Sequence, residues 1–315
     1  MRKIAAILVF GAGVLWGSMG IFVRLFENAG LGTMEIVEVR AITTTLIMFL
    51  FLFAYDRRLL IIKWKDLWCF LGTGIASIVF FNFCYFKSIT MTSLSVAAVL
   101  LYTAPAFVIL FSHILFGESL TARKVLALIL TFVGCVLVTG MLEHTGSVST
   151  GGILLGLGAG LGYAMYTIFS RCALKKGYHS FTISFYTFLV AAIGAIPMAD
   201  LRMTLKVSGG SAVMIGYSFM FGFITTVLAF IMYTTGMSMM DSGKAAIIAS
   251  VEPVVATIIG VVLYHESLTL CQWIGVVLVF GAIVMCSTEK NHFQIDRKCG
   301  ILNLLSGNTK GKDEL

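Results

Sequence analysis

The sequence predicts an all-α integral membrane protein, and three observations carry that prediction. Of the 315 residues, 59% are hydrophobic and only 12% are charged, which is more apolar surface than a soluble core of this size can bury. The apolar residues form long continuous runs, without the alternation typical of barrel strands. A segment from the first half of the chain also recurs near its end, which indicates a duplicated module.

Ten apolar runs are long enough to cross a bilayer, because a spanning helix needs about 20 residues. The predicted spans are 4–26, 33–54, 66–86, 91–117, 122–142, 151–172, 180–199, 212–235, 241–263 and 270–288. The first run follows Arg2 and Lys3, as in a signal peptide, but it is long enough to span and a later segment matches it, so we interpret it as the first helix. The predicted domains are 4–142, 151–288 and a polar tail, 289–315.

The positions of the basic residues predict the orientation of the chain. With the N-terminus inside, 17 of the 22 Lys and Arg residues fall in cytoplasmic segments, as the positive-inside rule requires. Ten spans then place both termini in the cytoplasm. The net charge of +7 reports this orientation, and we expect no nucleic-acid partner. The final Lys312–Leu315 matches a retrieval signal of the endoplasmic reticulum, but a cytoplasmic tail hides it from a luminal receptor.

A pattern of 17 residues occurs at 105–121 and again at 253–269, and each copy joins an apolar run to Glu-Ser-Leu-Thr. With an offset of 147 residues, the first helix also matches the sixth, pairing Trp16 with Tyr163. Each unit has five spans, an odd number, so equivalent helices cross the membrane in opposite directions. We therefore predict two inverted-topology repeats, a substrate site between them near mid-membrane, and alternating access.

Over residues 4 to 288 the chain resembles the drug/metabolite transporter superfamily, in particular its EamA-type ten-helix carriers. The matching pieces are Trp16-Gly17, Arg40, Tyr85 to Thr90, Pro105 with Glu118 to Thr121, and Glu252-Pro253 with Glu266 to Thr269. The resemblance implies a secondary carrier of small organic solutes, often an exporter of amino acids or related metabolites in bacteria. It also implies a central cavity lined by helices from both halves.

The repeated segments contain candidate hinges and gates. Pro105 and Pro253 each lie 13 residues before a glutamate, about 20 Å deeper in the span. A proline removes a backbone donor and frees carbonyl groups, so each is a hinge, a source of cavity-lining carbonyls, or a packing kink. Glu118 and Glu266 precede Ser-Leu-Thr, where the Thr caps the next helix and the carboxylate accepts loop amides. The alternative is a gate that pairs with basic groups on one membrane face at a time.

Charged residues inside the predicted spans are candidates for solute and proton binding, because unpaired charge is costly in a bilayer. Arg40 either holds a substrate carboxylate or pairs with Glu35 or Glu38 to fix the helix. Glu38 and Glu252 are the proton-coupling candidates, since a buried carboxylate takes up a proton readily. For Glu252 the alternative is a hydrogen bond within the scaffold. The position that matches Arg40 in the second half holds Thr187, so the charge cluster is asymmetric.

Six aromatic side chains are candidates to line the cavity, where ring faces bind apolar or cationic solutes. They are Trp16, Tyr85, Tyr102, Tyr163, Tyr166 and Tyr233. The alternative for each is simple packing. The seven cysteines and five histidines show no metal-ligand spacing, and no ATP-binding motif occurs, so we expect no metal and no cofactor.

We therefore predict a secondary active transporter, not an enzyme, in the cell membrane, most readily a bacterial cytoplasmic membrane. The expected partners are a small-molecule substrate and the lipid bilayer, with monomer and homodimer both open. The favoured function is proton- or gradient-linked export of amino acids or related compounds. The alternative is an uptake carrier for a small metabolite or amine. A membrane-embedded enzyme or a non-transporting scaffold are the competing classes, and an enzyme needs an acid, base or metal set at one membrane face.

Overall fold

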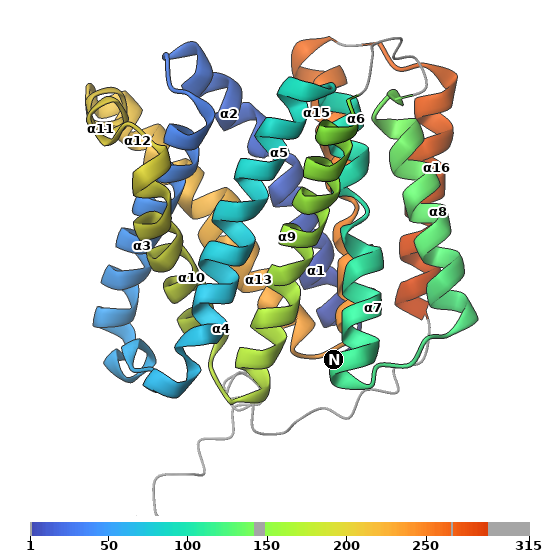
Figure 1. Cartoon of the computed structure of the whole chain (residues 1–315), viewed down its shortest axis with the longest axis horizontal. Coiled ribbons are helices and arrows are strands. Elements are labelled where there is room, and N and C mark those ends of the chain that lie inside the picture. The colour runs from blue at the N-terminus through green and yellow to red at the C-terminus, as the bar shows by residue number, and fades with distance from the viewer. Residues whose placement is uncertain (1, 142–148, 266, 289–315) are drawn as a thin grey trace, which may run out of the picture.

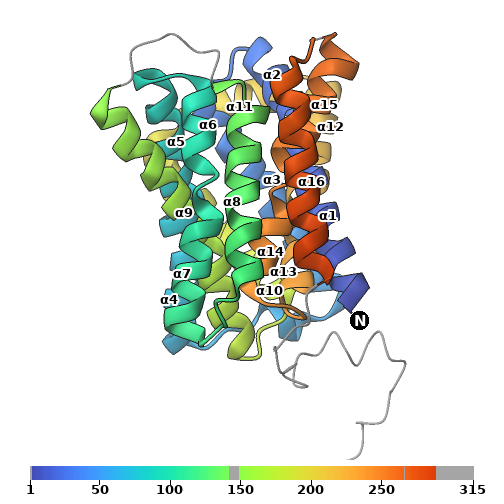
Figure 2. The ribbon, with the colours of Figure 1, turned by 90° about the vertical axis from the view of Figure 1, so that its right-hand side faces the viewer.

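The computed structural model describes residues 2–141, 149–265 and 267–288, and these residues form one bundle of helices with no strand among them (Figure 1). Nine helical segments of this part of the chain are long and apolar enough to cross a membrane. A further helix, α8 (Ala122–Val138), has 17 residues and packs along α16 (Leu270–Thr288), as Figure 2 shows. The predicted all-α membrane fold is confirmed.

The first half of the chain contains α1 to α8. Its elements are α1 (Arg2–Gly17), α2 (Met19–Asn28), α3 (Thr33–Tyr55), η1 (Arg57–Leu60), η2 (Trp64–Asp66), α4 (Leu67–Leu71), η3 (Gly72–Val79), α5 (Phe80–Met91), α6 (Leu94–Leu101), α7 (Ala104–Phe116) and α8. The segment η3 is a π-helix within the third span. π-Helical turns are rare and often lie at functional sites.

The second half contains α9 to α16. Its elements are α9 (Thr150–Lys175), α10 (Ser180–Ala195), η5 (Ile196–Met198), α11 (Leu201–Ser208), α12 (Ala212–Phe221), η6 (Gly222–Leu228), α13 (Ala229–Met237), α14 (Ser242–Ala249), α15 (Glu252–Tyr264) and α16. The π-helix η6 lies in the eighth span, where it matches η3. The same irregularity therefore occurs at equivalent places in the two halves.

One end of the bundle collects most of the basic residues, and we call it the basic end. The chain enters α1 there, and α7 and α9 end there, at the lower edge of Figure 1. The segment between α3 and α4, which contains Arg57, Lys63 and Lys65, lies at the same end, as does the start of α8, which contains Arg123. Figure 2 shows α16 ending close to the start of α1. The predicted polar tail, 289–315, lies outside the described residues.

Two of the predicted spans are broken near the middle of the bundle. The predicted span 91–117 consists of α6 and α7, and Pro105 occupies the first turn of α7. The predicted span 241–263 consists of α14 and α15, with Pro253 in the first turn of α15. A first-turn proline removes no hydrogen bond that the helix needs, and its fixed φ favours helix initiation. Each proline therefore starts a second half-helix.

Two equivalent glycines pack each repeat against the broken helix of the other. A Cβ on Gly13 of α1 would lie 2.8 Å from the Ala249 carbonyl oxygen, and one on Gly160 of α9 would lie 2.8 Å from the Leu100 carbonyl oxygen. Both carbonyls belong to the ends of half-helices, α14 and α6. Small residues permit such close approach of backbones in a membrane. The first helix of each repeat thus supports the break in the opposite repeat.

The sequence did not predict two further features of the backbone. The first predicted span breaks at Ser18, whose hydroxyl donates a 2.7 Å hydrogen bond to the Leu15 carbonyl. Such back-bonding bends helices. The short helix α11 lies between the seventh and eighth spans at the end opposite the basic end, and Asp200 caps it by accepting from two backbone amides. Its eight residues are too few for a spanning pattern.

Candidate functional site

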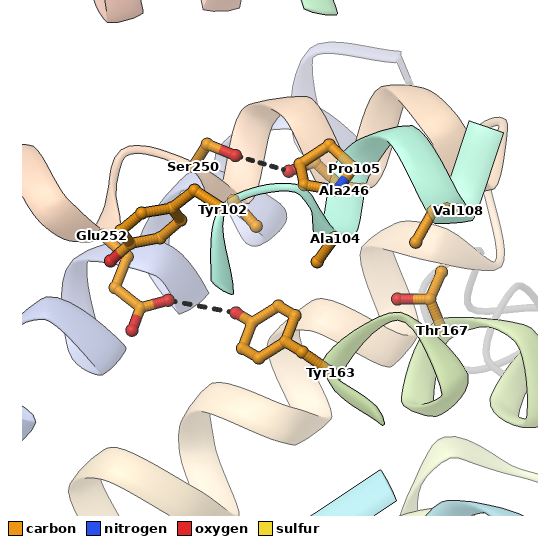
Figure 3. A pocket seen from close by; sticks show the side chains of 10 residues that line it. Tyr102, Ala104, Pro105, Val108, Tyr163, Thr167, Ala246, Ser250 and Glu252 are labelled. Atoms are coloured by element: carbon orange, nitrogen blue, oxygen red, sulfur yellow. Dashed lines mark hydrogen bonds between the residues drawn. The ribbon is translucent and has the colours of Figure 1, made fainter. Parts of the chain in front are cut away.

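The two helix breaks border a small cavity inside the bundle (Figure 3). It is lined by Tyr102, Ala104, Pro105, Val108, Tyr163, Thr167, Ala246, Ala249, Ser250 and Glu252. These residues come from both repeats, so the cavity lies between the two halves. Its open volume of about 10 Å³ is close to the space that one water molecule needs. This cavity therefore has to open before it can hold a metabolite.

Glu252 provides the negative charge at this cavity. It is the first residue of α15, where the helix dipole favours a carboxylate. Its Oε2 atom accepts a 3.0 Å hydrogen bond from the Tyr163 hydroxyl on α9, and Figure 3 shows the two groups pointing toward one another. The carboxylate also interacts electrostatically with Arg40. The carboxylate of the second repeat thus lines the cavity, and the cation that acts on it belongs to the first repeat.

Arg40 lies on α3 with only 4% of its surface exposed. Its Nη1 atom donates to the Met19 sulfur at 3.2 Å, and its Nε atom has no partner among the described residues. A guanidinium carries five N–H donors, and a thioether is a weak acceptor. Several donors of Arg40 are therefore left for an anionic group. Among the described residues, Arg40 forms no ion pair with Glu35 or Glu38. The predicted alternative, in which such a pair fixes the position of the helix, is therefore not seen among them.

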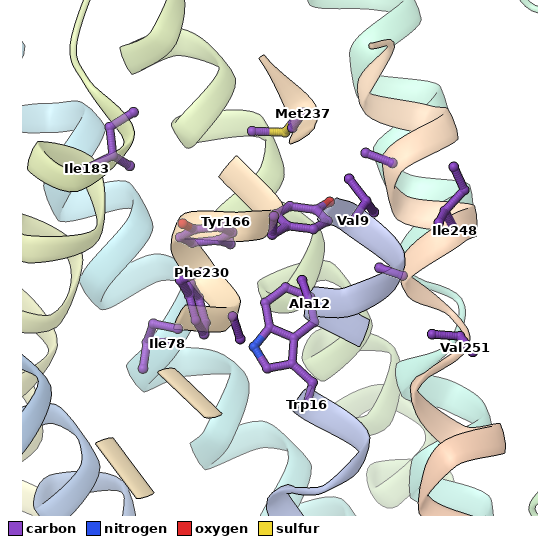
Figure 4. Packing of buried hydrophobic residues seen from close by; sticks show 14 of the residues in the cluster. Val9, Ala12, Trp16, Ile78, Tyr166, Ile183, Phe230, Met237, Ile248 and Val251 are labelled. Atoms are coloured by element: carbon purple, nitrogen blue, oxygen red, sulfur yellow. The ribbon is translucent and has the colours of Figure 1, made fainter. Parts of the chain in front are cut away.

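Trp16 lies at the centre of an aromatic cluster beside the cavity, shown in Figure 4. Its ring centroid is 6.2 Å from that of Tyr163, and 5.1 Å from those of Phe230 and Tyr233. Its indole N–H is buried and has no hydrogen-bond partner among the residues that the structure describes. Trp16 thus combines a packed ring with one buried donor that no described residue satisfies.

Tyr166 and Tyr233 belong to the packed part of the same cluster. The Tyr166 hydroxyl lies 2.7 Å from Thr234 Oγ1, and the Tyr233 hydroxyl lies 2.7 Å from Thr167 Oγ1. Both rings are almost fully buried, at 5% and 3% exposure. Neither residue lines the cavity, although Thr167 does. The structure therefore places these two tyrosines behind the cavity wall.

Tyr85 and Tyr102 complete the surroundings of Glu252. Both interact electrostatically with its carboxylate, and Tyr102 borders the cavity at the break after α6. Tyr85 packs on Phe81, with ring centroids 5.9 Å apart. The structure thus brings together side chains from five spans that the sequence singled out separately.

Glu38 is the site candidate that lies apart from this group. It is 1% exposed, and its Oε2 atom has no hydrogen-bond partner within the described ranges. It lies two residues before Arg40 on α3, about 200° around the helix axis. The two side chains therefore leave α3 on nearly opposite faces. Glu35 is also apart, because its carboxylate accepts the Asp200 amide at 3.0 Å beside α11.

Glu118 connects the two repeats at the basic end. It follows α7, and its Oε1 atom accepts the Ser242 amide at 2.8 Å, while Oε2 accepts the Gly243 amide at 3.3 Å. Both amides belong to the first turn of α14. Arg171 of α9 approaches Oε1 at 3.7 Å and donates to the Met237 carbonyl at 2.7 Å. One carboxylate thus caps a helix of the other repeat and meets a buried cation.

A second ion pair lies beside Glu118. Lys124 Nζ is 2.9 Å from Asp241 Oδ2 and donates to the Ser119 carbonyl at 2.9 Å. Lys244 approaches the same Asp241 oxygen at 3.9 Å. Such buried charges need partners because desolvation is costly. The basic-end charge cluster consists of Glu118, Lys124, Arg171, Asp241 and Lys244.

The remaining candidates are the residues of the two Glu-Ser-Leu-Thr segments and the side chains of metal-ligand type. Thr121 begins α8 by accepting the Lys124 amide at 3.2 Å, which matches the capping interpretation of the Glu-Ser-Leu-Thr segment. Glu266, the equivalent of Glu118, lies outside the described residues. Within the described ranges, no three His, Cys, Asp or Glu side chains gather as a metal site requires.

Sequence reasoning missed several residues that complete the site. Thr167 lies one turn after Tyr163 on α9 and borders the same cavity. Met19 contacts Arg40, and Asp241 holds two lysines. Thr167 was detectable in principle, because residues four apart share a helix face. Met19 and Asp241 gave no comparable signal, since their contacts join segments that are distant in the chain.

Two halves of opposite direction, a closed central cavity and buried charges from both halves define a multi-pass membrane carrier. The model of the EamA-like transporter family matches residues 3–140 and again 150–288, and the chain belongs to this family. The two matches fit the predicted pair of inverted repeats. Membership indicates a transporter rather than an enzyme.

Curated relatives have similar lengths and transporter names. An "Uncharacterized transporter" of Archaeoglobus fulgidus is 30% identical over 294 residues, which cover 92% of this chain and 98% of the relative. The "Uncharacterized transporter YxxF" of Bacillus subtilis is 26% identical and is covered over 89% of its length. A solved crystal structure superposes with a TM-score of 0.75 at 17% identity, covering 91% of this chain and 98% of its own. That last likeness shows the fold alone.

Proposed function

We propose that this EamA-family transporter exports an amino acid or a related small metabolite in exchange for protons, by alternating access. One observation carries the proposal: Glu252 of the second repeat lines a cavity between the two repeats, and the buried Arg40 of the first repeat acts electrostatically on its carboxylate. Charged side chains inside a membrane protein are energetically costly, and they often mark the pathways of solutes and ions. The two charges match the two ends of a zwitterion.

The solute is proposed to bind between these charges. Its carboxylate takes the free donors of Arg40, because a guanidinium binds a carboxylate through two parallel hydrogen bonds. Its ammonium lies near Glu252 and the ring of Tyr163, since aromatic faces attract cations. The indole N–H of Trp16 supplies a further donor, and the breaks at Pro105 and Pro253 let the half-helices move to admit the solute.

Glu252 is proposed to couple this binding to protons. An ionised Glu252 attracts the ammonium group, whereas a protonated Glu252 leaves Arg40 as the dominant charge and releases the zwitterion. The same carboxylate then holds either a solute or a proton, which links their movement in opposite directions. Tyr163 stabilises the ionised form by donating its hydroxyl proton in a hydrogen bond.

The basic end is proposed to face the cytoplasm of a cell with a proton gradient directed inward, in keeping with the positive-inside rule. The outward direction of solute movement rests on the resemblance to EamA-type carriers, many of which export. Uptake of a small metabolite is the alternative, and it uses the same site with the opposite gradient.

The test uses the purified chain in proteoliposomes with a panel of amino acids and amines. A pH gradient should drive amino acid movement against its concentration gradient. Glu252→Gln should reduce this gradient-driven flux by about 100-fold, because the site no longer exchanges a proton. Solute exchange at equal pH should fall as well, because the neutral side chain no longer attracts the ammonium group. Flux is measured with radiolabelled solute on both sides of the membrane.

Glu27→Gln is the matched control, because Glu27 is an exposed carboxylate at the end of α2. It should transport like the parent protein. Unchanged gradient-driven flux in Glu252→Gln would show that this carboxylate only holds the scaffold. Absence of flux with every solute, in a protein that remains folded, would contradict the amino acid proposal itself.

A further inference from the structure

The face of α9 that looks toward the cavity continues from the centre of the bundle to the basic end. Tyr163, Thr167 and Arg171 are each four residues apart, so they share one helix face. Tyr163 bonds to Glu252, and Thr167 bonds to Tyr233 at 2.7 Å. Arg171 completes the row beside Glu118. Polar groups therefore lead from the central carboxylate to the basic end.

The cavity already follows this face away from Glu252. Its lining includes both Glu252 and Thr167, and Thr167 lies one turn of α9, about 6 Å, closer to the basic end than Tyr163. The walls opposite Thr167 are formed by Val108 of α7 and Ala246 of α14. Figure 3 shows Val108 and Thr167 together at one end of the lining, with Glu252 at the other. The helices α7, α9 and α14 thus all contribute to the lining of the cavity.

Glu118 joins these same three helices beneath the cavity. It follows α7 directly, its carboxylate accepts two amides of α14, and Arg171 reaches it from α9. Its side chain is 7% exposed. Hydrogen bonds to a buried carboxylate are strong, because a buried charge without hydrogen-bond donors has a large desolvation penalty. Within the basic-end charge cluster, Glu118 therefore links α7, α9 and α14.

We propose that the inner half of the transport path runs along α9 between α7 and α14, from Glu252 past Thr167, and that Glu118 is the latch that closes it. Opening requires the carboxylate to leave the first turn of α14, which then moves about the break before Pro253. Water replaces α14 as the partner of Glu118. The inference rests only on the alternating-access part of the proposed function.

The test is the accessibility of a cysteine introduced in the path. Thr167→Cys is labelled with a charged, membrane-impermeant methanethiosulfonate reagent, added to inside-out vesicles or to intact cells. Mass spectrometry of the peptide that carries residue 167 measures the label, so the native cysteines do not interfere. With Glu118→Gln in addition, labelling from the basic end should accelerate about tenfold, because loss of one charged hydrogen-bond acceptor weakens the closed state.

Asp66→Asn provides the matched control. Asp66 also lies in an ion pair at the basic end, but with Lys176 and Tyr178, away from α14. This variant should label Thr167→Cys at the parental rate. Ala246→Cys is a second reporter on the facing helix and should respond to Glu118→Gln in the same way.

The outcomes separate this inference from the proton and amino acid proposals, because labelling needs neither a solute nor a pH gradient. Equal labelling rates with and without Glu118→Gln would overturn the latch. Faster labelling from the opposite end would overturn the direction of the path. If Glu118→Gln does not accumulate, Glu118→Asp shortens the side chain, keeps the charge, and should give the same acceleration.

Discussion

The first helices of the two repeats hold equivalent places but carry different chemistry. In the second repeat, α9 runs unbroken through Thr150–Lys175 and presents Tyr163, Thr167 and Arg171 on one face. The equivalent first-half positions hold Trp16, Gly20 and Arg24. The first-half helix also breaks at Ser18. Arg24 lies 3.9 Å above the ring of Tyr264 at the end opposite the basic end, and Arg171 lies 3.7 Å from the Glu118 carboxylate at the basic end.

The features that recur in both repeats belong to the scaffold, whereas the charges at the cavity do not recur. The two prolines and the glycines Gly13 and Gly160 remain paired, and they position the helix breaks in both halves. The two charges near the cavity are not equivalent positions of the repeat, because Arg40 belongs to the first half and Glu252 to the second. A carrier that opens alternately needs similar movements at both ends, but only one binding site.

The largest expected effect comes from giving the first half the residue of the second. Arg40→Thr introduces the threonine that the second repeat carries as Thr187. We expect at least a 100-fold loss of affinity for a solute with a carboxylate, because a charged, buried hydrogen-bonded pair is worth about 3 kcal/mol. The dissociation constant is measured by isothermal titration calorimetry on the purified protein.

Two comparisons make this prediction specific. An amine that lacks the carboxylate should bind Arg40→Thr and the parent protein equally. Thr187→Val changes the equivalent residue, whose hydroxyl bonds to Thr73 at 2.7 Å, and should leave affinity for both solutes within about threefold. Equal loss for the amine and the carboxylated solute would mean that Arg40 supports the fold rather than the solute.

Substitution of the two equivalent glycines should have a smaller effect, and the loss of stability should be equal in the two halves. Gly13→Ala and Gly160→Ala each place a methyl group 2.8 Å from a backbone carbonyl oxygen that cannot rotate away. We expect each to destabilise the protein by about 1–3 kcal/mol, the usual cost of overpacking. The measurement is the thermal unfolding midpoint in detergent.

Gly281→Ala on α16 is the control, because a Cβ there meets nothing within 4 Å. It should leave the midpoint unchanged or raise it, since alanine favours helix. A large loss for Gly160→Ala alone would show that the two breaks are not supported equally, and the symmetry of the scaffold would then be limited to its outline.

The sequence predicted the fold well because helices in a bilayer satisfy their own backbone, so length and hydropathy suffice to find them. It also singled out Trp16, Arg40 and Glu252 as site candidates, since charges and repeated aromatics stand out in apolar spans, and these assignments stay predictions. It did not predict where these side chains meet. Glu38 and Arg40 are two residues apart in the sequence, yet helix geometry separates them, whereas Arg40 and Glu252 are distant in the chain and interact.

The basic-end charge cluster illustrates the remaining limit. Glu118 was predicted to accept loop amides or to act as a gate, and it accepts backbone amides in the first turn of α14 and lies near Arg171. These amides belong to the other repeat, which the sequence did not indicate. No local pattern encodes that choice, because it depends on how α7 and α14 pack.

The smallest expected effect concerns an ion pair at the same end as the buried cluster, in which the lysine is exposed and the aspartate is buried. Lys176 Nζ lies 2.6 Å from Asp66 Oδ1, and this hydrogen bond raises the pKa of the Lys176 amine above its ordinary value. The contact therefore contributes fully below the ordinary amine pKa and is lost as pH rises through the raised value. Asp66→Asn should return the pKa of Lys176 toward its ordinary value, so the amine loses its proton at lower pH.

Acetylation of Lys176 by acetic anhydride, followed by mass spectrometry across a pH series, measures this change, because only the neutral amine reacts. Asp66→Asn should move the reaction profile to lower pH, while transport stays at the parental level. Tyr178→Phe removes a different partner of Asp66, at 2.8 Å, and should move the profile less. Identical profiles in all three proteins would show that water, rather than Asp66, sets the charge of this exposed amine, and that charge pairing at the basic end depends on burial.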